Sequence, residues 1–177
     1  VGFEEVWTDK FGNIIGRIGN DKYGQDALAM YRKLHIATDM IKIDDTIHSG
    51  ISVILIDDKG HNLISVALGA NLKLLKDDID SSAEVIKNSF LVGFQLENSH
   101  ETVFYGLRRT HALGVTTFLD PAPASKLPDD LYPYIDIIKP NETTDFAGAP
   151  SIPTRIGTTL DAEKSKSKRA IFSSCLL

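Results

Sequence analysis

The sequence predicts an α/β fold with a mostly parallel sheet and a small β-hairpin attached to it. Between residues 77 and 139, segments with helical apolar spacing alternate with short apolar segments typical of buried strands. Between residues 46 and 68, the pattern changes to a period of two on both sides of a turn-rich segment. The 177 residues include 42% hydrophobic and 24% charged ones, a composition typical of one globular domain.

The first predicted elements are a strand, a turn and an amphipathic helix. The strand covers Asn13 to Ile18, and the turn that follows leads to a helix starting near Asp21. Acidic residues at the start of this helix suit its dipole. The apolar residues that fall at helical spacing, and that we expect on its inner side, are Ala27, Met30, Tyr31 and Leu34.

A β-hairpin is predicted from Thr46 to Leu68, with its turn at Asp57 to Gly60. Alternation places Ile51, Val53 and Leu55 on one face, and Ser52, Ile54 and Ile56 on the other. Both faces are therefore largely apolar. One of them must cover the parent domain, a ligand or a second subunit.

After the hairpin, helices and strands alternate, so we expect parallel strands joined by right-handed crossovers. Ser99 is expected to cap the second helix, and Gly114 to stop it. In order, the predicted elements are a helix at Asp77 to Asn88, a strand at Phe90 to Gln95, a helix to Leu113, a strand at Val115 to Leu119, a helical turn near Pro128 to Tyr132 and a strand at Ile135 to Lys139.

Composition excludes several classes of function. The net charge of −5 gives no general electrostatic footprint for nucleic acid. No apolar run approaches the roughly 20 residues of a membrane helix. Cys175, the single cysteine, can form neither an internal disulfide nor a cysteine-based zinc cluster, and we expect a cytoplasmic protein. The histidines are scattered singly, so we assign no metal ligand.

Polar residues follow each of the three strands in the predicted parallel sheet. They are Glu97 after the first strand, Asp120 after the second, and Asn141 with Glu142 after the third. Ligands of open parallel sheets bind outside the carboxyl ends of the strands, so these residues are candidates for a site. The alternative is that loops are simply polar.

Several segments resemble, in order and spacing, those of the ribokinase-like (PfkB) carbohydrate kinases, and within that family most closely the ribokinase branch. The resemblance covers roughly Ile14 to Thr143. The segments are Gly16-Arg17-Ile18-Gly19-Asn20-Asp21-Lys22-Tyr23-Gly24, Ser49-Gly50-Ile51-Ser52-Val53-Ile54, Asn62-Leu63-Ile64-Ser65-Val66 with Gly69-Ala70-Asn71, Gln95-Leu96-Glu97, Asp120-Pro121-Ala122-Pro123-Ala124 and Lys139-Pro140-Asn141-Glu142-Thr143.

The resemblance implies a three-layer sandwich with a mostly parallel, incomplete sheet over residues 14–144, a β-lid at about 46–68 and an unassigned tail at 145–177. It implies transfer of the γ-phosphoryl group of ATP to a primary hydroxyl of a pentose such as ribose, with Mg²⁺ and, in the complete enzyme, a monovalent cation. Glu97 would hydrogen-bond sugar hydroxyls, and Asn141 would lie near the nucleotide phosphates and magnesium. Ser52 and Ile54 match lid positions that cover the sugar, although Ile54 fits ordinary strand packing equally well. The lid would also form a homodimer.

The sequence also departs from the family pattern. Thr144 stands where family members carry a glutamate, and neither the early Gly-Gly segment nor a Gly-Ala-Gly-Asp segment is found. In the family, the second of these supplies the base that deprotonates the sugar and a helix N-terminus that stabilises the transferring phosphoryl group. We therefore assign no catalytic residue and expect an internal part of a larger fold, with little or no kinase activity.

Two other interpretations remain open. The chain could be a non-catalytic sugar-binding or dimerisation module that uses the apolar hairpin for pairing. It could also be a truncated or mis-spliced product, whose unpaired strand edges would make it poorly soluble.

Overall fold

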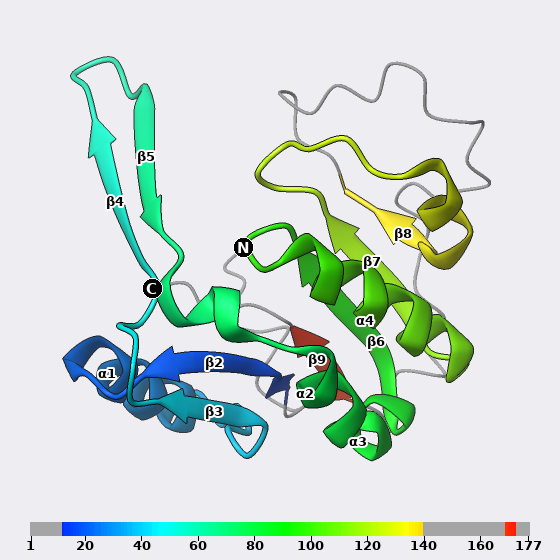
Figure 1. Ribbon diagram of the computed structural model, residues 1–177. Helices are drawn as coiled ribbons and strands as arrows, with labels where there is room; N and C mark the ends of the chain where they lie inside the picture. The colour runs from blue at the N-terminus through cyan, green and yellow to red at the C-terminus, as the bar shows by residue number, and fades with distance from the viewer. Residues whose placement is uncertain (1–11, 140–168, 173–177) are drawn as a thin grey trace.

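The computed structural model describes residues 12–139 and the strand at 169–172, and its largest element is a parallel sheet (Figure 1). Within the described residues this sheet has five strands in the order β1-β9-β6-β7-β8, and every neighbouring pair is parallel. The predicted parallel sheet is thus confirmed. The strands are β1 (Asn13–Ile14), β6 (Ser89–Gln95), β7 (Thr116–Asp120), β8 (Ile137–Ile138) and β9 (Arg169–Phe172).

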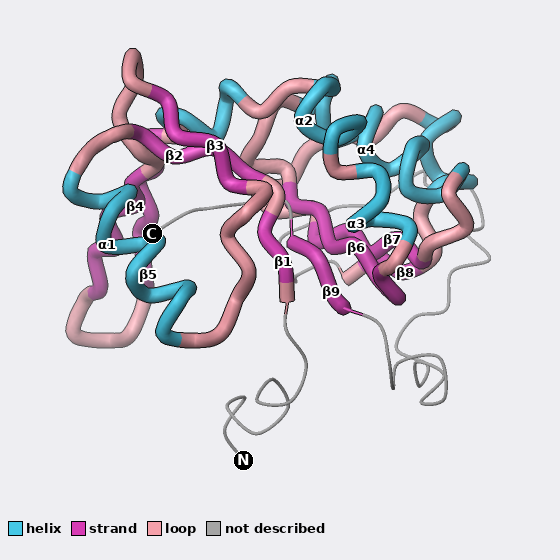
Figure 2. The backbone as a smooth tube through the Cα atoms, turned by 90° about the horizontal axis from the view of Figure 1, so that it is seen from below, coloured by secondary structure: helices cyan, strands magenta, loops and turns pink. Residues whose placement is uncertain are grey.

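Three helices lie along one side of this sheet, as Figure 2 shows from below. They are α2 (Lys76–Ser81), α3 (Ala83–Lys87) and α4 (His100–Ala112), and the 3₁₀ helix η3 (Asp129–Tyr134) precedes β8. Val103, Leu107 and Thr110, which fall at helical spacing on α4, are all buried. A Cβ atom at Gly106 would lie 2.6 Å from the ring of Phe94, so α4 packs very closely on β6.

The predicted helix at 77–88 is broken into α2 and α3 at Ser82. The Ser82 hydroxyl donates a hydrogen bond of 2.8 Å to the carbonyl oxygen of Asp78. A serine that bonds back to the preceding turn in this way bends or interrupts a helix. Ile79 and Ile86, which lie on either side of the break, are both buried in the main core.

A second, smaller sheet pairs β2 (Gly16–Gly19) in parallel with β3 (Ile41–Asp44). It packs against α1 (Lys22–Lys33) through a core cluster of Ile14, Ile18, Ala27, Leu28 and Tyr31. The predicted strand at 13–18 is thus divided between two sheets at Ile15, and β3 was not predicted. The expectation for Met30 and Leu34 was wrong, because they lie outside the buried stripe of α1 and are 44% and 58% exposed.

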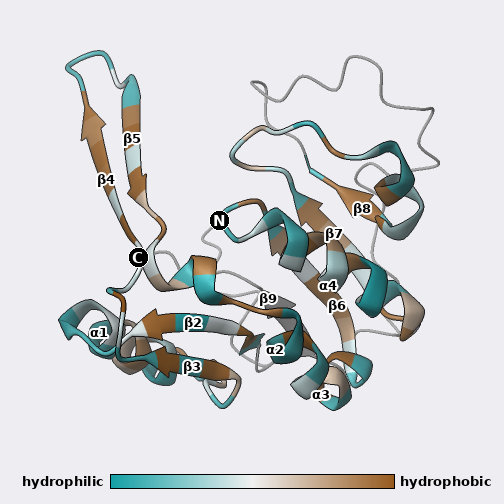
Figure 3. Cartoon of the chain, in the orientation of Figure 1, coloured by the Kyte–Doolittle hydropathy of each residue, from teal (hydrophilic) through white to brown (hydrophobic). Residues whose placement is uncertain are grey.

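The predicted hairpin consists of β4 (Ile51–Ile56) and β5 (Asn62–Ala67), paired in antiparallel register. It stands away from the rest of the fold, and its strands are largely hydrophobic (Figures 1 and 3). Val53 and Leu55 on one face are 54% and 60% exposed, and Ile54 and Ile56 on the other are 55% and 70% exposed. Both faces are therefore apolar, as predicted, and both are open to solvent.

Candidate functional site

The carboxyl ends of β6 and β7 bring two of the predicted acidic residues to one edge of the sheet. Gln95 lies opposite Asp120 in the parallel register, and Glu97 follows two positions after Gln95. The arrowheads of β6 and β7 point toward the side of the molecule on which the hairpin stands (Figure 1). Glu97 and Asp120 therefore lie together where two neighbouring parallel strands end, whereas Asn141 and Glu142 lie outside the described residues.

The loops that follow β6 and β7 are bonded to each other. The Leu96 amide donates to the carbonyl oxygen of Ala122 at 2.9 Å, and the Ala122 amide donates to the carbonyl oxygen of Asp120 at the same distance. The Ala122-Pro123 peptide bond is cis. This backbone pairing connects the segments that carry Glu97 and Asp120.

Glu97 is half-buried, and its surroundings disfavour its charge. Burial raises the pKa of the Glu97 carboxyl, and the nearby negative charge of Asp120 raises it further. A carboxylate only accepts hydrogen bonds, so a ligand that brings hydroxyl donors would offset this cost. The edge of β6 and β7 is chemically suited to a polyhydroxylated ligand.

The lid positions lie on a different element from the acidic edge. Ser52 and Ile54 lie two positions apart on β4, so both belong to the same face of the hairpin. Ser52, near the root, is half-buried, and its partner on β5 is Val66; Ile54 is exposed and pairs with Ile64. Because 55% of the surface of Ile54 remains open, its side chain is accessible from the solvent side of the hairpin.

A cluster that was not predicted anchors the root of the hairpin. The Asp21 carboxylate accepts hydrogen bonds from the Ser49 amide at 2.8 Å and from the Ser49 hydroxyl at 2.7 Å. The Gly24 amide donates to the same carboxylate at 2.8 Å, which caps α1. The segment 16–24 was singled out for its resemblance to a family turn, but nothing in its spacing indicates that the partner of Asp21 lies 28 positions further along the chain.

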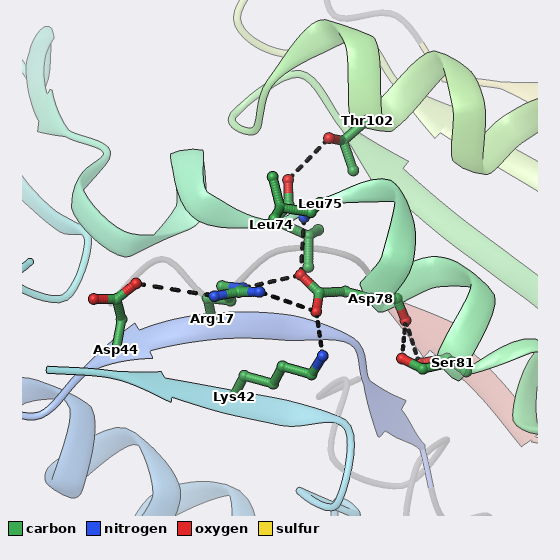
Figure 4. A network of polar contacts seen from close by, with 9 residues as sticks. Arg17, Lys42, Asp44, Leu74, Leu75, Asp78, Ser81 and Thr102 are labelled. Atoms are coloured by element: carbon green, nitrogen blue, oxygen red, sulfur yellow. Dashed lines mark hydrogen bonds and ion pairs between the residues drawn. The ribbon is translucent and has the colours of Figure 1, made fainter. Parts of the chain in front are cut away.

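A second unpredicted network ties the small sheet to α2 (Figure 4). The Asp78 carboxylate is 3% exposed and accepts from Arg17 Nε at 2.9 Å, from Lys42 Nζ at 2.6 Å and from the Leu75 amide at 2.8 Å. Burial alone would raise the pKa of Asp78, but the bonds from Arg17, Lys42 and Leu75 outweigh burial and lower this pKa. The Thr102 hydroxyl donates to the carbonyl oxygen of Leu74 at 2.9 Å, which links the same segment to α4.

The described ranges were searched for a cluster of metal ligands and for a membrane-spanning helix. They contain no group of three or more His, Cys, Asp or Glu side chains that could hold a metal ion. None of their helices has the length and apolar character needed to cross a bilayer.

Comparison with known proteins assigns the family. A sequence model of the pfkB family carbohydrate kinases matches residues 12–164. The chain belongs to this family. The ribokinase of Staphylococcus aureus (strain COL) is 36% identical over 129 residues, which are 73% of this chain and 42% of that protein.

Solved structures of family members have the same α/β architecture. The ribokinase of Giardia lamblia superimposes with a TM-score of 0.67 at 26% identity, over 73% of this chain and 41% of that one. The Arabidopsis thaliana ribokinase complexed with ribose and ATP gives 0.66 at 25% identity, over 79% of this chain and 46% of that one. The fold is therefore that of a ribokinase-like carbohydrate kinase, and the chain spans less than half the length of these relatives.

Proposed function

We propose that this chain forms the sugar-binding part of an ATP-dependent pentose kinase, which transfers the γ-phosphoryl group to a primary hydroxyl of a sugar such as ribose. The observation that carries the proposal is the half-buried Glu97 beside Asp120, at the strand edge that points toward the hairpin. The names of its relatives, ribokinase and deoxyribokinase, support a pentose as the substrate.

In this proposal each predicted residue has one role. Glu97 accepts hydrogen bonds from vicinal sugar hydroxyls, and its interaction strengthens because the site is partly shielded from water. Ser52 and Ile54 cover the sugar from the hairpin. Asn141 contributes an amide oxygen near the nucleotide phosphates, a group that suits Mg²⁺. When bound, MgATP supplies the phosphoryl group and neutralises part of its charge. A monovalent cation and a cytoplasmic location belong to the same proposal.

Ribose titration followed by calorimetry tests the site. We expect the 177-residue chain to bind ribose. The ribose affinity of Glu97→Ala should be lower by about tenfold or more, since the hydrogen bonds to a charged acceptor disappear. Glu101→Gln is the matched control, because Glu101 lies four positions away, is exposed and pairs with Lys76. Equal ribose affinity in the wild type and Glu97→Ala would contradict the assignment.

The same samples also test phosphoryl transfer. A coupled ADP-release assay with ribose and MgATP should give little or no turnover, because the 177 residues contain no Gly-Ala-Gly-Asp segment. Turnover at about 1 s⁻¹ or above would overturn that expectation.

A second candidate function is a non-catalytic module that associates through the hairpin. The exposed apolar side chains on both faces of β4 and β5 favour it. Light scattering tests this candidate, since a strictly monomeric, well-folded chain counts against association.

A further inference from the structure

We propose that Asp21 and Ser49 form a clamp that sets the orientation of the hairpin relative to the edge of the sheet carrying Glu97. In this assignment both are positioning residues, which act on the site through the hairpin and do not touch the sugar. The consequence for sugar binding rests on the proposed function, but the clamp itself does not.

The hairpin is held by its root. From Val53 to Ala67 every residue is exposed, whereas Ser49 and Gly50 before β4, and Gly69 and Ala70 after β5, are buried. The Ala70 amide donates to the carbonyl oxygen of His48 at 2.9 Å, so the two arms are joined where they leave the core. Any change of angle at this root is therefore carried to the whole of β4 and β5.

The clamp fixes the incoming arm by both backbone and side chain. One carboxylate oxygen of Asp21 accepts from the Ser49 amide, and the other accepts from the Ser49 hydroxyl and the Gly24 amide. The Ser49 hydroxyl oxygen in turn accepts from the Gly19 amide at 3.0 Å. Ser49 is 1% exposed. The end of β2, the start of α1 and the start of β4 thus meet at one ionised side chain.

Glycines around the clamp let the backbone segments approach one another closely. A Cβ atom at Gly19 would lie 2.5 Å from the Ser49 nitrogen, and one at Gly24 would overlap the carbonyl oxygen of Gly19. Gly69 has φ +51°, a conformation that glycine adopts without strain, and a Cβ atom there would overlap the carbonyl oxygen of His48. The geometry is therefore that of a tightly packed joint.

The charge of Asp21 is maintained at neutral pH. The bond from the Gly24 amide lowers the pKa of the Asp21 carboxyl, and the two bonds from Ser49 lower it further. Charged acceptors form stronger hydrogen bonds than neutral ones, so the carboxylate suits a clamp.

The decisive substitution is Asp21→Asn. Asparagine is as good a helix cap as aspartate, and its oxygen can still accept from Gly24, so α1 should be retained. Its amide group, however, donates only, so the two acceptor oxygens of the carboxylate cannot both be replaced. Ser49→Ala breaks the clamp from the other side, and Ser49→Thr keeps the hydroxyl.

The measurement is a distance distribution by double electron–electron resonance in the full chain. Spin labels are placed at Lys59→Cys on the hairpin turn and Glu84→Cys on α3, both exposed positions, in a Cys175→Ser background. We expect one narrow distribution in the unsubstituted chain and in Ser49→Thr, and a broad or shifted one in Asp21→Asn and Ser49→Ala. Amide exchange at Ser49 should rise by about tenfold in Asp21→Asn. Asp26→Asn, an exposed change on the same helix, should leave the distribution narrow.

An unchanged narrow distribution in folded Asp21→Asn and Ser49→Ala overturns the proposal. If Asp21→Asn does not fold, the comparison of Ser49→Ala with Ser49→Thr decides, because a purely steric role of Ser49 would not be rescued by the hydroxyl. Ribose affinity should fall together with the broadening. Absence of ribose binding in the unsubstituted chain would contradict the proposed function alone, since the distance distributions need no ligand.

Discussion

At the scale of single residues, Glu97 and Asp21 show opposite uses of a carboxylate. Glu97 is half-buried beside another acid, and burial followed by the charge of Asp120 raises the pKa of its carboxyl. Asp21 is surrounded by donors that lower the pKa of its carboxyl. A residue whose charge is unfavourable while the site holds no ligand is typical of binding positions. A charged residue whose hydrogen bonds are all made within the protein stabilises the fold instead.

Glu97→Gln should therefore stabilise the chain at neutral pH while it weakens ribose binding. A raised pKa in the folded state means that the ionised form destabilises it, so removing the charge should add up to about 1 kcal/mol to the free energy of unfolding, about 2–4 °C in Tm. The gain should shrink as pH falls toward 4.5, the ordinary pKa of the group, because Glu97 then becomes protonated. Thermal melts of both chains between about pH 4 and pH 7, a range that extends from near the ordinary pKa of a glutamate to neutral pH, measure this gain.

Glu101→Gln is again the control for stability. Lys76 lowers the pKa of the exposed Glu101 carboxyl, so this substitution should give no gain at neutral pH. A Glu97→Gln chain that melts no higher than the wild type at neutral pH would show that the charge of Glu97 carries no cost.

Both acids at the edge of the sheet could be predicted from the sequence, because parallel strands end at one edge. The clamp could not, since Asp21 and Ser49 are brought together only by the pairing of β2 with β3 and the course of the chain toward β4. Sequence spacing contains no signal for a contact of that kind.

At the scale of elements, the hairpin is the feature that the rest of the fold leaves least covered. Its two faces differ in composition: Ser52 and Ile54 lie on one, and Val53 and Leu55 on the other. Leu55 is paired with Leu63 across the strands, and these are 60% and 67% exposed. If the first face covers the sugar, the second is available for a second copy of the chain.

Leu55→Glu should therefore abolish self-association and leave ribose affinity unchanged, while Ile54→Glu should weaken ribose binding. Charges placed on an apolar interface are costly when they are buried without a partner. Because both positions are exposed in the single chain, its free energy of unfolding should change by no more than about 0.5 kcal/mol. Sedimentation velocity over a range of concentrations measures self-association, and the calorimetric titration measures ribose affinity. A wild-type chain that stays monomeric at every concentration contradicts the association.

At the scale of the whole molecule, Asp78 links the small sheet of β2 and β3 to the side of the larger sheet through polar contacts. It receives Arg17 from β2 and Lys42 from β3, and it lies on α2, which packs with the larger sheet (Figure 4). The small sheet also carries the root of the hairpin. Asp78 thus joins the sheet that carries this root to α2.

Asp78→Ala should lower the free energy of unfolding by about 2–3 kcal/mol, because the part-buried Arg17 guanidinium loses its 2.9 Å bond to Asp78 and keeps the longer contact to Asp44, at 3.9 Å. Lys42 contributes less, since half of its side chain is exposed. Urea denaturation followed by circular dichroism gives the value, and Asp77→Ala, at an adjacent exposed position, is the control.

The pH dependence gives this prediction a second readout. The pKa of Asp78 is lowered in the folded state, so its contribution is present above the ordinary value of 3.8 and is lost as pH falls below it. Acid should therefore destabilise the wild type more steeply than Asp78→Ala. Parallel acid curves for the two chains would show that the carboxylate is not stabilised by its partners.

A soluble, cooperatively melting wild type in these experiments would also argue against a mis-spliced product. Such a product would expose unpaired strand edges and uncovered apolar surface.

The sequence by itself determined the alternation of helices and strands, the hairpin with two apolar faces and the acidic edge at Glu97 and Asp120. These follow from periodicity and from the rule that parallel strands end together, which are local or nearly local properties. Only the tertiary structure decided that residues 13–18 divide between two sheets, that β9 joins the larger one, and that Asp21 and Asp78 hold the hairpin and the small sheet in place. The physical reason is that strand order and buried ion pairs depend on which distant segments meet, and many pairings of the same segments satisfy the same local pattern.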